Sequence, residues 1–286
     1  QNKRRRWEEV QAEFRVKGRQ PELWDAETGE SRDQRDFAFT DAGTRCAPAT
    51  LEAMARRFAD PGVGCVSGVD RHLEAGGTHG ESWYLRYEMF LRRLETRAGS
   101  LVGLSGSLFA VRREICDRWS EDKPSDFHIV LDAIRMGYRG VSEPAAIGFY
   151  RPLAEEAREF RRKVRTVLRG MTAFFQSLDL LNPIRHGLAA WQLVSHKLFR
   201  WLVPFFQVVC LGTAATLAPQ ATFFAAVLGL QLAFYAAALL GWKPGVQWRA
   251  CRVPYWFCLY NASILAAWIQ FLLGRRIVLW EPTRRG

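Results

Sequence analysis

Two long stretches without a charged residue constrain this fold more than any other feature of the sequence. No Asp, Glu, Lys or Arg occurs in residues 201–242 or in residues 253–274. A helix crosses a hydrocarbon core of roughly 30 Å with about 20 apolar residues, and Pro219-Gln220 supplies a turn within the first stretch. The sequence therefore predicts a transmembrane region over residues 199–286, with three spans at about 201–218, 221–241 and 253–274.

Positive charge gathers at the ends of these stretches. The chain has a formal net charge of +11, and from residue 199 onward eight Lys or Arg residues stand against one acid, Glu281. Apolar segments with basic flanks are typical of membrane proteins, and the pattern argues against nucleic acid as a partner. We therefore expect a multi-pass protein of the plasma or inner membrane that contacts membrane lipid.

The basic flanks disagree with three complete spans. Three crossings would place Arg275 and Arg276 on the side opposite Lys197 and Arg200, whereas basic flanks prefer the cytoplasmic side. Either the third segment crosses incompletely or one boundary differs from the prediction.

Ahead of the apolar region, short strands and helices alternate. Residues 1–35 are dense in charge, which predicts a solvated or poorly ordered arm. The run DFAFT at 36–40 predicts a strand, residues 48–58 a helix and residues 63–69 another strand, which together form a βαβ-like unit. Asp41 follows the first strand and is either a ligand of a hard cation, Mg²⁺ or Mn²⁺, that binds a diphosphate, or part of an ordinary turn.

The stretch at 99–150 carries the clearest candidate for acid–base chemistry. A glycine-punctuated loop leads into a short strand at 108–111, and a helix then begins near Asp126 and stops at Gly137, before an extended segment over 140–150. A carboxylate at a helix start beside such a loop is suited to act as a general base. The alternative role for Asp126 is a helix N-cap.

Two longer amphipathic helices are predicted on either side of this stretch. The first covers residues 81–97 and has Tyr84, Tyr87, Leu91 and Leu94 on one apolar face. The second covers residues 155–181, with apolar positions from Phe160 to Leu178. Three interpretations of the second helix stay open. It either lies along a membrane, or presents its cations to a phosphate group, or carries a solvated basic stripe. Its basic residues are Arg158, Arg161, Arg162, Lys163, Arg165 and Arg169.

Five segments carry a resemblance to a known family. They read FTDAGTRCAPATLEAMARRFADPGVGCVSG, YLRYEMFLRRLETRAGSLVGLSGSLFAVRRE, PSDFHIVLDAIRMGYRGVSEPAA, FRRKVRTVLRG and SHKLFRWLVPF. In this order they resemble the membrane-bound family-2 glycosyltransferases, which include the cellulose, hyaluronan and poly-N-acetylglucosamine synthases. The resemblance covers about residues 36–286. It implies an α/β, GT-A-type (Rossmann-like) catalytic domain on the cytoplasmic face, followed by C-terminal transmembrane helices.

The resemblance also implies an activity. A sugar would pass from a nucleotide-sugar donor, such as a UDP-sugar, to a hydroxyl of a glycan or lipid acceptor with inversion, in polysaccharide or glycolipid synthesis. A divalent cation, Mg²⁺ or Mn²⁺, would serve as cofactor. Asp41 matches the acidic turn that binds metal and diphosphate, Asp126 matches the catalytic base, and Gly106 and Ser107 match the acceptor-side loop.

The basic helix matches a further motif of that family. Arg162 and Arg165 fall on the Gln and Arg positions of the Gln-x-x-Arg-Trp motif, and with Lys163 they would hold the donor diphosphate. Thr166 replaces the tryptophan of the motif. This change removes an aromatic platform for a growing sugar chain and argues against processive synthesis.

Other departures concern the donor side. The acidic turn reads DAG, so its second usual acid is absent, and Ser125 stands where the family commonly has Asp or Glu. Nothing in residues 1–35 resembles the opening strands that bind the nucleotide, so the chain looks like the later part of a longer enzyme. The expected organisation is a charged arm, a partial GT-A domain over 36–154, a basic interfacial helix and linker over 155–198, and the transmembrane region.

Two other classes of function stay open at this stage. The missing opening strands and the DAG turn favour a non-catalytic membrane scaffold or an inactive glycosyltransferase fragment. A basic protein that only binds anionic lipid would need neither Asp41 nor Asp126.

Overall fold

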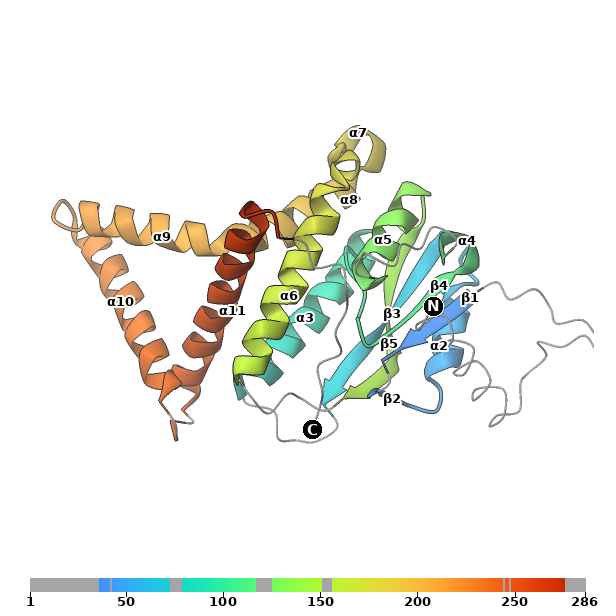
Figure 1. The fold of residues 1–286 in the computed structure, drawn as a ribbon, viewed down its shortest axis with the longest axis horizontal. Coiled ribbons are helices and arrows are strands. Elements are labelled where there is room, and N and C mark those ends of the chain that lie inside the picture. The colour runs from blue at the N-terminus through green and yellow to red at the C-terminus, as the bar shows by residue number, and fades with distance from the viewer. Residues whose placement is uncertain are drawn as a thin grey trace, which may run out of the picture. The chain divides into compact units, whose positions relative to one another are not determined.

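The computed structural model describes residues 36–275, except 42, 73–78, 117–124, 151–155, 244 and 247 (Figure 1). The charged arm predicted for residues 1–35 lies outside the described residues. Within the described part, an α/β region is followed by long apolar helices.

The α/β region is built on a five-stranded mixed sheet with the order β1-β4-β3-β5-β2. Strand β4 runs antiparallel to both β1 and β3, whereas β3 and β5 run parallel and β2 adds a short antiparallel edge. The strands are β1 (Asp36–Thr40), β2 (Arg45–Cys46), β3 (Val63–His72), β4 (Leu108–Arg112) and β5 (Arg139–Tyr150).

The predicted βαβ unit is present, but its two strands are not neighbours. Strands β1 and β3 run in the same direction, and helix α2 (Thr50–Arg57) connects them. Strand β4 lies between them and pairs with both. Its first four residues are all buried, as expected for an inner strand that is covered on both faces.

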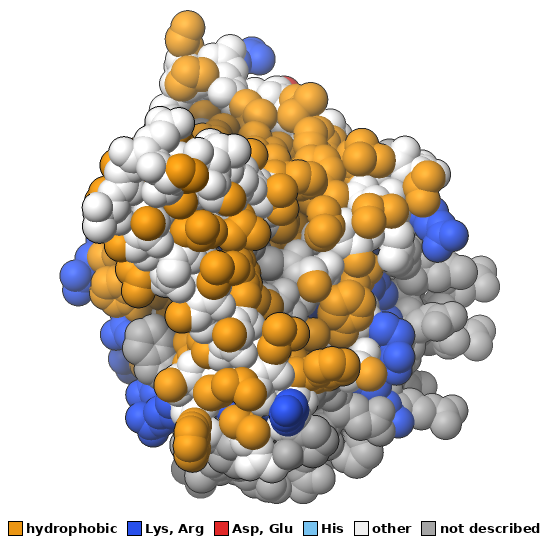
Figure 2. Space-filling view, turned by 90° about the vertical axis from the view of Figure 1, so that its left-hand side faces the viewer, with side chains coloured by type: hydrophobic (Ala, Val, Ile, Leu, Met, Phe, Trp, Pro, Cys, Tyr) orange, Lys and Arg blue, Asp and Glu red, His pale blue; other side chains and the backbone are white. Residues whose placement is uncertain are grey.

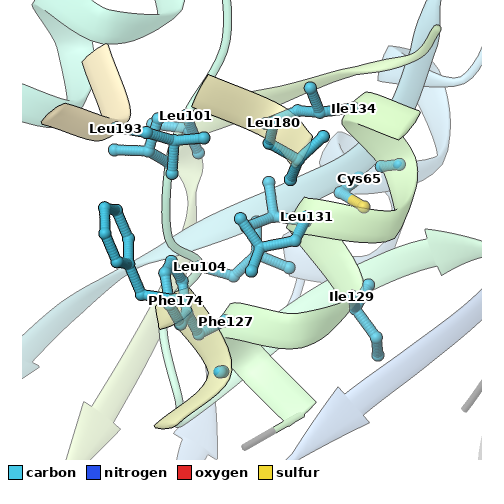
Figure 3. Packing of buried hydrophobic residues seen from close by; sticks show 14 of the residues in the cluster. Cys65, Leu101, Leu104, Phe127, Ile129, Leu131, Ile134, Phe174, Leu180 and Leu193 are labelled. Carbon is cyan, nitrogen blue, oxygen red and sulfur yellow. The ribbon is translucent and has the colours of Figure 1, made fainter. Parts of the chain in front are cut away.

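Alternation along the inner strands builds two hydrophobic clusters, one on each face of the sheet. In β4, Leu108 and Ala110 join the cluster of α2, whereas Phe109 and Val111 join the larger cluster of α5 (Ser125–Arg135) and α6 (Glu156–Phe175). Figure 3 shows this larger cluster, in which residues of α5 meet Cys65 of β3 and Leu180 from beyond α6. Helix α5 ends at Arg135, and Gly137 just beyond it has a φ of 84°, a left-handed conformation that glycine adopts readily.

The helix predicted for 155–181 is in fact two elements. Helix α6 ends at Phe175, and a 3₁₀ turn, η1 (Leu178–Leu181), follows it. Arg135 of α5 donates to both carboxylate oxygens of Asp179 at 2.8 and 2.9 Å, which holds this turn beside α5. Leu178 therefore leaves the apolar face of the helix and is 52 % exposed.

Helix α3 (His79–Ala98) also differs from its prediction in the face that it buries. Tyr87 and Leu94, expected on the apolar face, are half-exposed, whereas Met89 and Glu95 are buried. The helix turns polar side chains inward because it lies beside the loop at 99–107 and the basic start of the first apolar helix, where charged partners are available.

Three helices are long and apolar enough to cross a membrane, as predicted. Helix α9 (Phe199–Leu217) continues α8 (Leu188–Leu193) and a π-helical turn, η2 (Val194–Leu198), whereas Gly187 separates the short α7 (Pro183–His186) from them. Helices α10 (Thr222–Trp242) and α11 (Arg249–Leu272) follow. Figure 2 shows the face that these helices form, which is covered mainly by apolar side chains, with Lys and Arg toward its edges.

Candidate active site

The loop at 99–107 brings the backbone close to the Asp126 carboxylate. Leu104 N donates to Asp126 O at 3.1 Å, so the loop is bound to the first turn of α5. A Cβ atom on Gly106 would lie 3.3 Å from Asp126 Oδ2, closer than most side chains tolerate. Glycine at this position therefore lets the loop pass directly beside the carboxylate.

The same loop is fixed to the ends of β1 and β3. Ser105 Oγ donates to Asp70 Oδ1 at 2.6 Å, and Ser107 Oγ donates to the same oxygen. Asp41 N donates to Ser107 O at 3.0 Å. The structure thus brings Asp41, Ser107 and Asp126 to one loop. Asp70, which sequence reasoning missed, positions this loop; its place near the end of a predicted strand was the available signal.

Asp126 is a partly buried carboxylate among cations. Burial raises the pKa of its carboxyl above the ordinary value of 3.8, while the charges of Lys197, Arg169 and Arg92 act in the opposite direction. Desolvation makes a carboxylate more basic, and nearby cations keep it ionised. This balance suits a group that must accept a proton near neutral pH.

Lys197 comes from the π-helical turn that opens the first apolar helix. Its Nζ lies 4.8 Å from the centroid of the Phe127 ring and 2.6 Å from where a Cβ on Gly103 would stand. The neighbouring His196 pairs through Nδ1 with Glu95 of α3. π-Helical turns often occur at functional sites. The sequence places both residues at a membrane edge, and only the tertiary structure brings Lys197 to Asp126.

The predicted diphosphate-binding residues of α6 have different surroundings. Arg162 donates to the two carboxylate oxygens of Glu159 at 2.6 and 2.7 Å. Lys163 Nζ lies 4.6 Å from the centroid of the Tyr260 ring in α11. Burial lowers the pKa of the Arg169 guanidinium, and the charge of the nearby Arg165 lowers it further. Their binding of a diphosphate stays a prediction.

The described residues of the candidate site offer few ligands for a divalent cation. No group of three His, Cys, Asp or Glu residues is placed to hold a metal ion within the described part of the chain. Asp41 offers one carboxylate, whereas Asp70 Oδ1 already accepts two hydroxyl groups. Mg²⁺ is commonly bound through one or two carboxylates together with substrate phosphates and water. A cation held by Asp41 together with a bound diphosphate therefore stays a prediction.

Sequence comparisons identify no relative of this chain: no family model and no curated protein matches it. Among solved structures, it is similar to the mannosyltransferase PcManGT from Pyrobaculum calidifontis in complex with GDP-Man and Mn²⁺. The two share 22 % identity with a TM-score of 0.56, over 85 % of this chain and 63 % of that one. The chain thus spans less than two thirds of the solved structure. It has the fold of a GT-A glycosyltransferase, a mixed α/β sheet domain, followed by three long apolar helices.

Proposed function

We propose that this protein is an inverting glycosyltransferase of family 2. It transfers a sugar from a nucleotide-sugar donor to an acceptor hydroxyl at the cytoplasmic face of the membrane, in polysaccharide or glycolipid synthesis. The observation that carries the proposal is the position of Asp126, which lies at the start of α5 beside Gly106 and among cations.

The geometry supports one assignment of roles. Asp126 takes the proton of the acceptor hydroxyl, and the oxygen attacks the anomeric carbon from the side opposite the diphosphate, so that the configuration inverts. Negative charge grows on the departing diphosphate, and Arg165 with its neighbours on α6 stabilises it. Asp41 would hold Mg²⁺ or Mn²⁺ together with the diphosphate, and the ion would supply further neutralisation of this charge.

A donor panel tests this function. The protein, expressed from its complete gene and purified in detergent micelles, is mixed with UDP-sugars and GDP-mannose, and the release of nucleoside diphosphate is measured with and without EDTA. We expect release that depends on a divalent cation with at least one donor. The absence of release with every donor would instead support a non-catalytic membrane scaffold.

Contacts between the start of α9 and the end of α11 give information on how the apolar helices are oriented in the membrane. Trp268 Nε1, near the end of α11, donates to Trp201 O at the start of α9 at 2.9 Å, and Phe205 packs edge-on against Trp268. In Figure 1 the three apolar helices accordingly meet end to end. We infer that Arg275 and Arg200 face the same side, the cytoplasmic one, and that one of the three helices does not cross completely. This arrangement agrees with the positive-inside rule.

Cysteine labelling tests this orientation. Single cysteines are placed at Arg185 and Arg275, which are exposed, after the native cysteines are changed to Ser. A membrane-impermeant maleimide is then applied to sealed vesicles of known orientation. We expect both positions to react from the same side, and labelling from opposite sides would disprove the inference. A third cysteine at Gln220, between α9 and α10, shows whether α9 is the helix that does not cross.

A further inference from the structure

Arg92 of α3 connects its helix to β3 and to the loop at 99–107. Its Nη1 donates to Ser67 Oγ of β3 at 3.1 Å, and its Nη2 donates to Leu104 O of the loop at 3.3 Å. The side chain is 12 % exposed, and Nη2 lies 3.6 Å from Glu88 Oε1, one turn earlier in α3. A buried guanidinium is costly unless its donors are paired, and two of its partners here are neutral groups outside α3.

These two partners hold one peptide group of the loop from both sides. The carbonyl of Leu104 accepts from Arg92, and the N–H of Ser105, which belongs to the same peptide group, donates to Ser67 Oγ at 2.8 Å. Leu104, Ser105 and Ser67 are all buried. Leu104 N in turn donates to Asp126 O at 3.1 Å. Arg92 is therefore linked to the first turn of α5 through a single loop residue.

The peptide group held by Arg92 comes directly before the glycine that lies beside the candidate base. A Cβ atom on Gly106 would lie 3.3 Å from Asp126 Oδ2. On its other side, Leu104 packs in the same hydrophobic cluster as Phe127, as Figure 3 shows. A movement of this peptide group would change the space beside the carboxylate. Misplacement by about 1 Å can cost roughly 100-fold in the rate of a catalysed reaction.

Arg92 also acts on Asp126 through its charge. Burial raises the pKa of the Asp126 carboxyl, while nearby cations, Arg92 among them, lower it. The guanidinium is bound to the loop and to β3, so its charge keeps a fixed place relative to the carboxylate. The other charged groups that act on Asp126 or pair with its neighbours are Lys197 of η2, Arg169 of α6, Glu88 and Glu95 of α3, and His196 of η2.

We propose that Arg92 is a positioning residue for Asp126: it fixes the 104–105 peptide group at the start of α5 and holds a positive charge at a constant place near the base. This role rests on the proposed function, in which Asp126 accepts the proton. Lysine at position 92 would keep the charge, but a single ammonium group does not reproduce the planar fork that reaches two acceptors. Glutamine would lose the charge and keep one donor group.

Two substitutions at position 92 separate the hydrogen bonds from the charge. In the protein expressed from its complete gene and purified in detergent micelles, Arg92→Gln and Arg92→Lys should both slow transfer, by up to about 100-fold. In Arg92→Gln the fall of the rate toward low pH should begin at a higher pH than in the wild type, because a cation that lowers the pKa of Asp126 is gone. Arg92→Lys should keep the wild-type pH profile.

The neighbouring Arg93 provides the matched control. Its side chain is exposed and its Nε donates to Met89 O of the same helix at 3.4 Å. Arg93→Gln removes the same charge one position along α3 and should change neither the rate nor the pH profile. Equal slowing of the two Arg92 variants without any shift of the pH profile would show that Arg92 serves only packing, and would overturn the proposal.

The pH dependence of unfolding gives a readout that needs no turnover. The raised pKa of Asp126 means that its carboxyl stabilises the folded protein at low pH, and that this stability is lost as the pH rises through the folded pKa. Asp126→Asn lacks this change, so the difference between the unfolding temperatures of the Asp and Asn proteins locates the interval. In the same pair carrying Arg92→Gln, the interval should extend to higher pH. With Arg93→Gln it should stay in place.

The two readouts keep this inference apart from the proposed function. An interval that does not extend in Arg92→Gln would overturn the positioning role, whatever the rate of transfer. If no donor is turned over but the interval extends, the proposed function fails, whereas the action of Arg92 on Asp126 stands.

Discussion

Replacing Asp126 by Asn should lower the rate of sugar transfer by about 10²–10⁴-fold, the usual loss when a positioned general base is removed. Asparagine keeps the size and one oxygen of the side chain, but it does not accept a proton from the acceptor hydroxyl. Donor affinity should stay close to normal, because the carboxylate is assigned to the acceptor. The measurement is single-turnover transfer at saturating donor, together with donor titration.

The raised pKa of Asp126 also predicts how the transfer rate and the stability depend on pH. Because burial raises this pKa, the wild-type rate should fall as the pH drops through the raised value, and the residual rate of the Asn variant should lose this dependence. A folded pKa above the unfolded value also means that the free energy of unfolding decreases as the pH rises through that interval. At neutral pH the ionised carboxylate therefore costs stability, and the variant should unfold at no lower temperature than the wild type.

A surface acid provides the matched control for Asp126. Asp60→Asn makes the same chemical change at an exposed carboxylate that pairs with Arg139, and transfer should continue at nearly the wild-type rate. Near-normal turnover in Asp126→Asn would reject the base assignment, whatever the control shows.

Gly241→Ala should destabilise the pair of helices α10 and α11 by about 1–3 kcal/mol or more, the usual cost of overpacking. A methyl group on Gly241 would overlap the carbonyl oxygen of Cys251 and lie 3.0 Å from Tyr255 Cβ. Arg252 Nη1 donates to Gly241 O at 3.1 Å in the same place. The nearest atoms belong to the backbone of Cys251, so a change of side-chain rotamer does not relieve the overlap. Thermal unfolding in detergent micelles measures the effect.

The same substitution elsewhere in α10 should not lower the stability of the helix pair. A Cβ on Gly229 would meet no atom within 4 Å, and alanine is favoured over glycine in a helix by up to about 1 kcal/mol. Gly229→Ala should therefore leave the unfolding temperature unchanged or raise it. Equal behaviour of the two alanine variants would show that α10 and α11 do not approach each other as closely as the structure has them.

Several elements followed from local chemistry and needed no tertiary information. The uncharged stretches predicted three long apolar helices, and these are present. Alternation and turn residues predicted β1, β3, β4 and β5 nearly at their observed bounds. The carboxylate ahead of an apolar helical pattern placed Asp126 in the first turn of α5. In each case the signal lies within a few neighbouring residues, where periodicity and glycine or proline positions act directly.

Other features depended on contacts between distant parts of the chain. The place of β4 between β1 and β3 is a matter of pairing, on which a strand's own sequence says little. The 3₁₀ turn after α6 is held beside α5 by the ion pair between Arg135 and Asp179, which are 44 positions apart. The roles of Asp70 and Arg169 near the candidate site likewise come from residues that meet only in the folded protein.

By itself the sequence determined the class of the molecule: a GT-A-type α/β region joined to apolar helices, with a carboxylate beside a glycine loop. Only the tertiary structure decided what surrounds that carboxylate. Lys197 is 71 positions from Asp126 and belongs to the π-helical turn at the head of an apolar helix. Glycine at position 103 leaves room for its ammonium group, because a Cβ atom there would lie 2.6 Å from Nζ. Periodicity reports which face of an element is apolar, whereas the charges that meet across elements depend on how those faces pack.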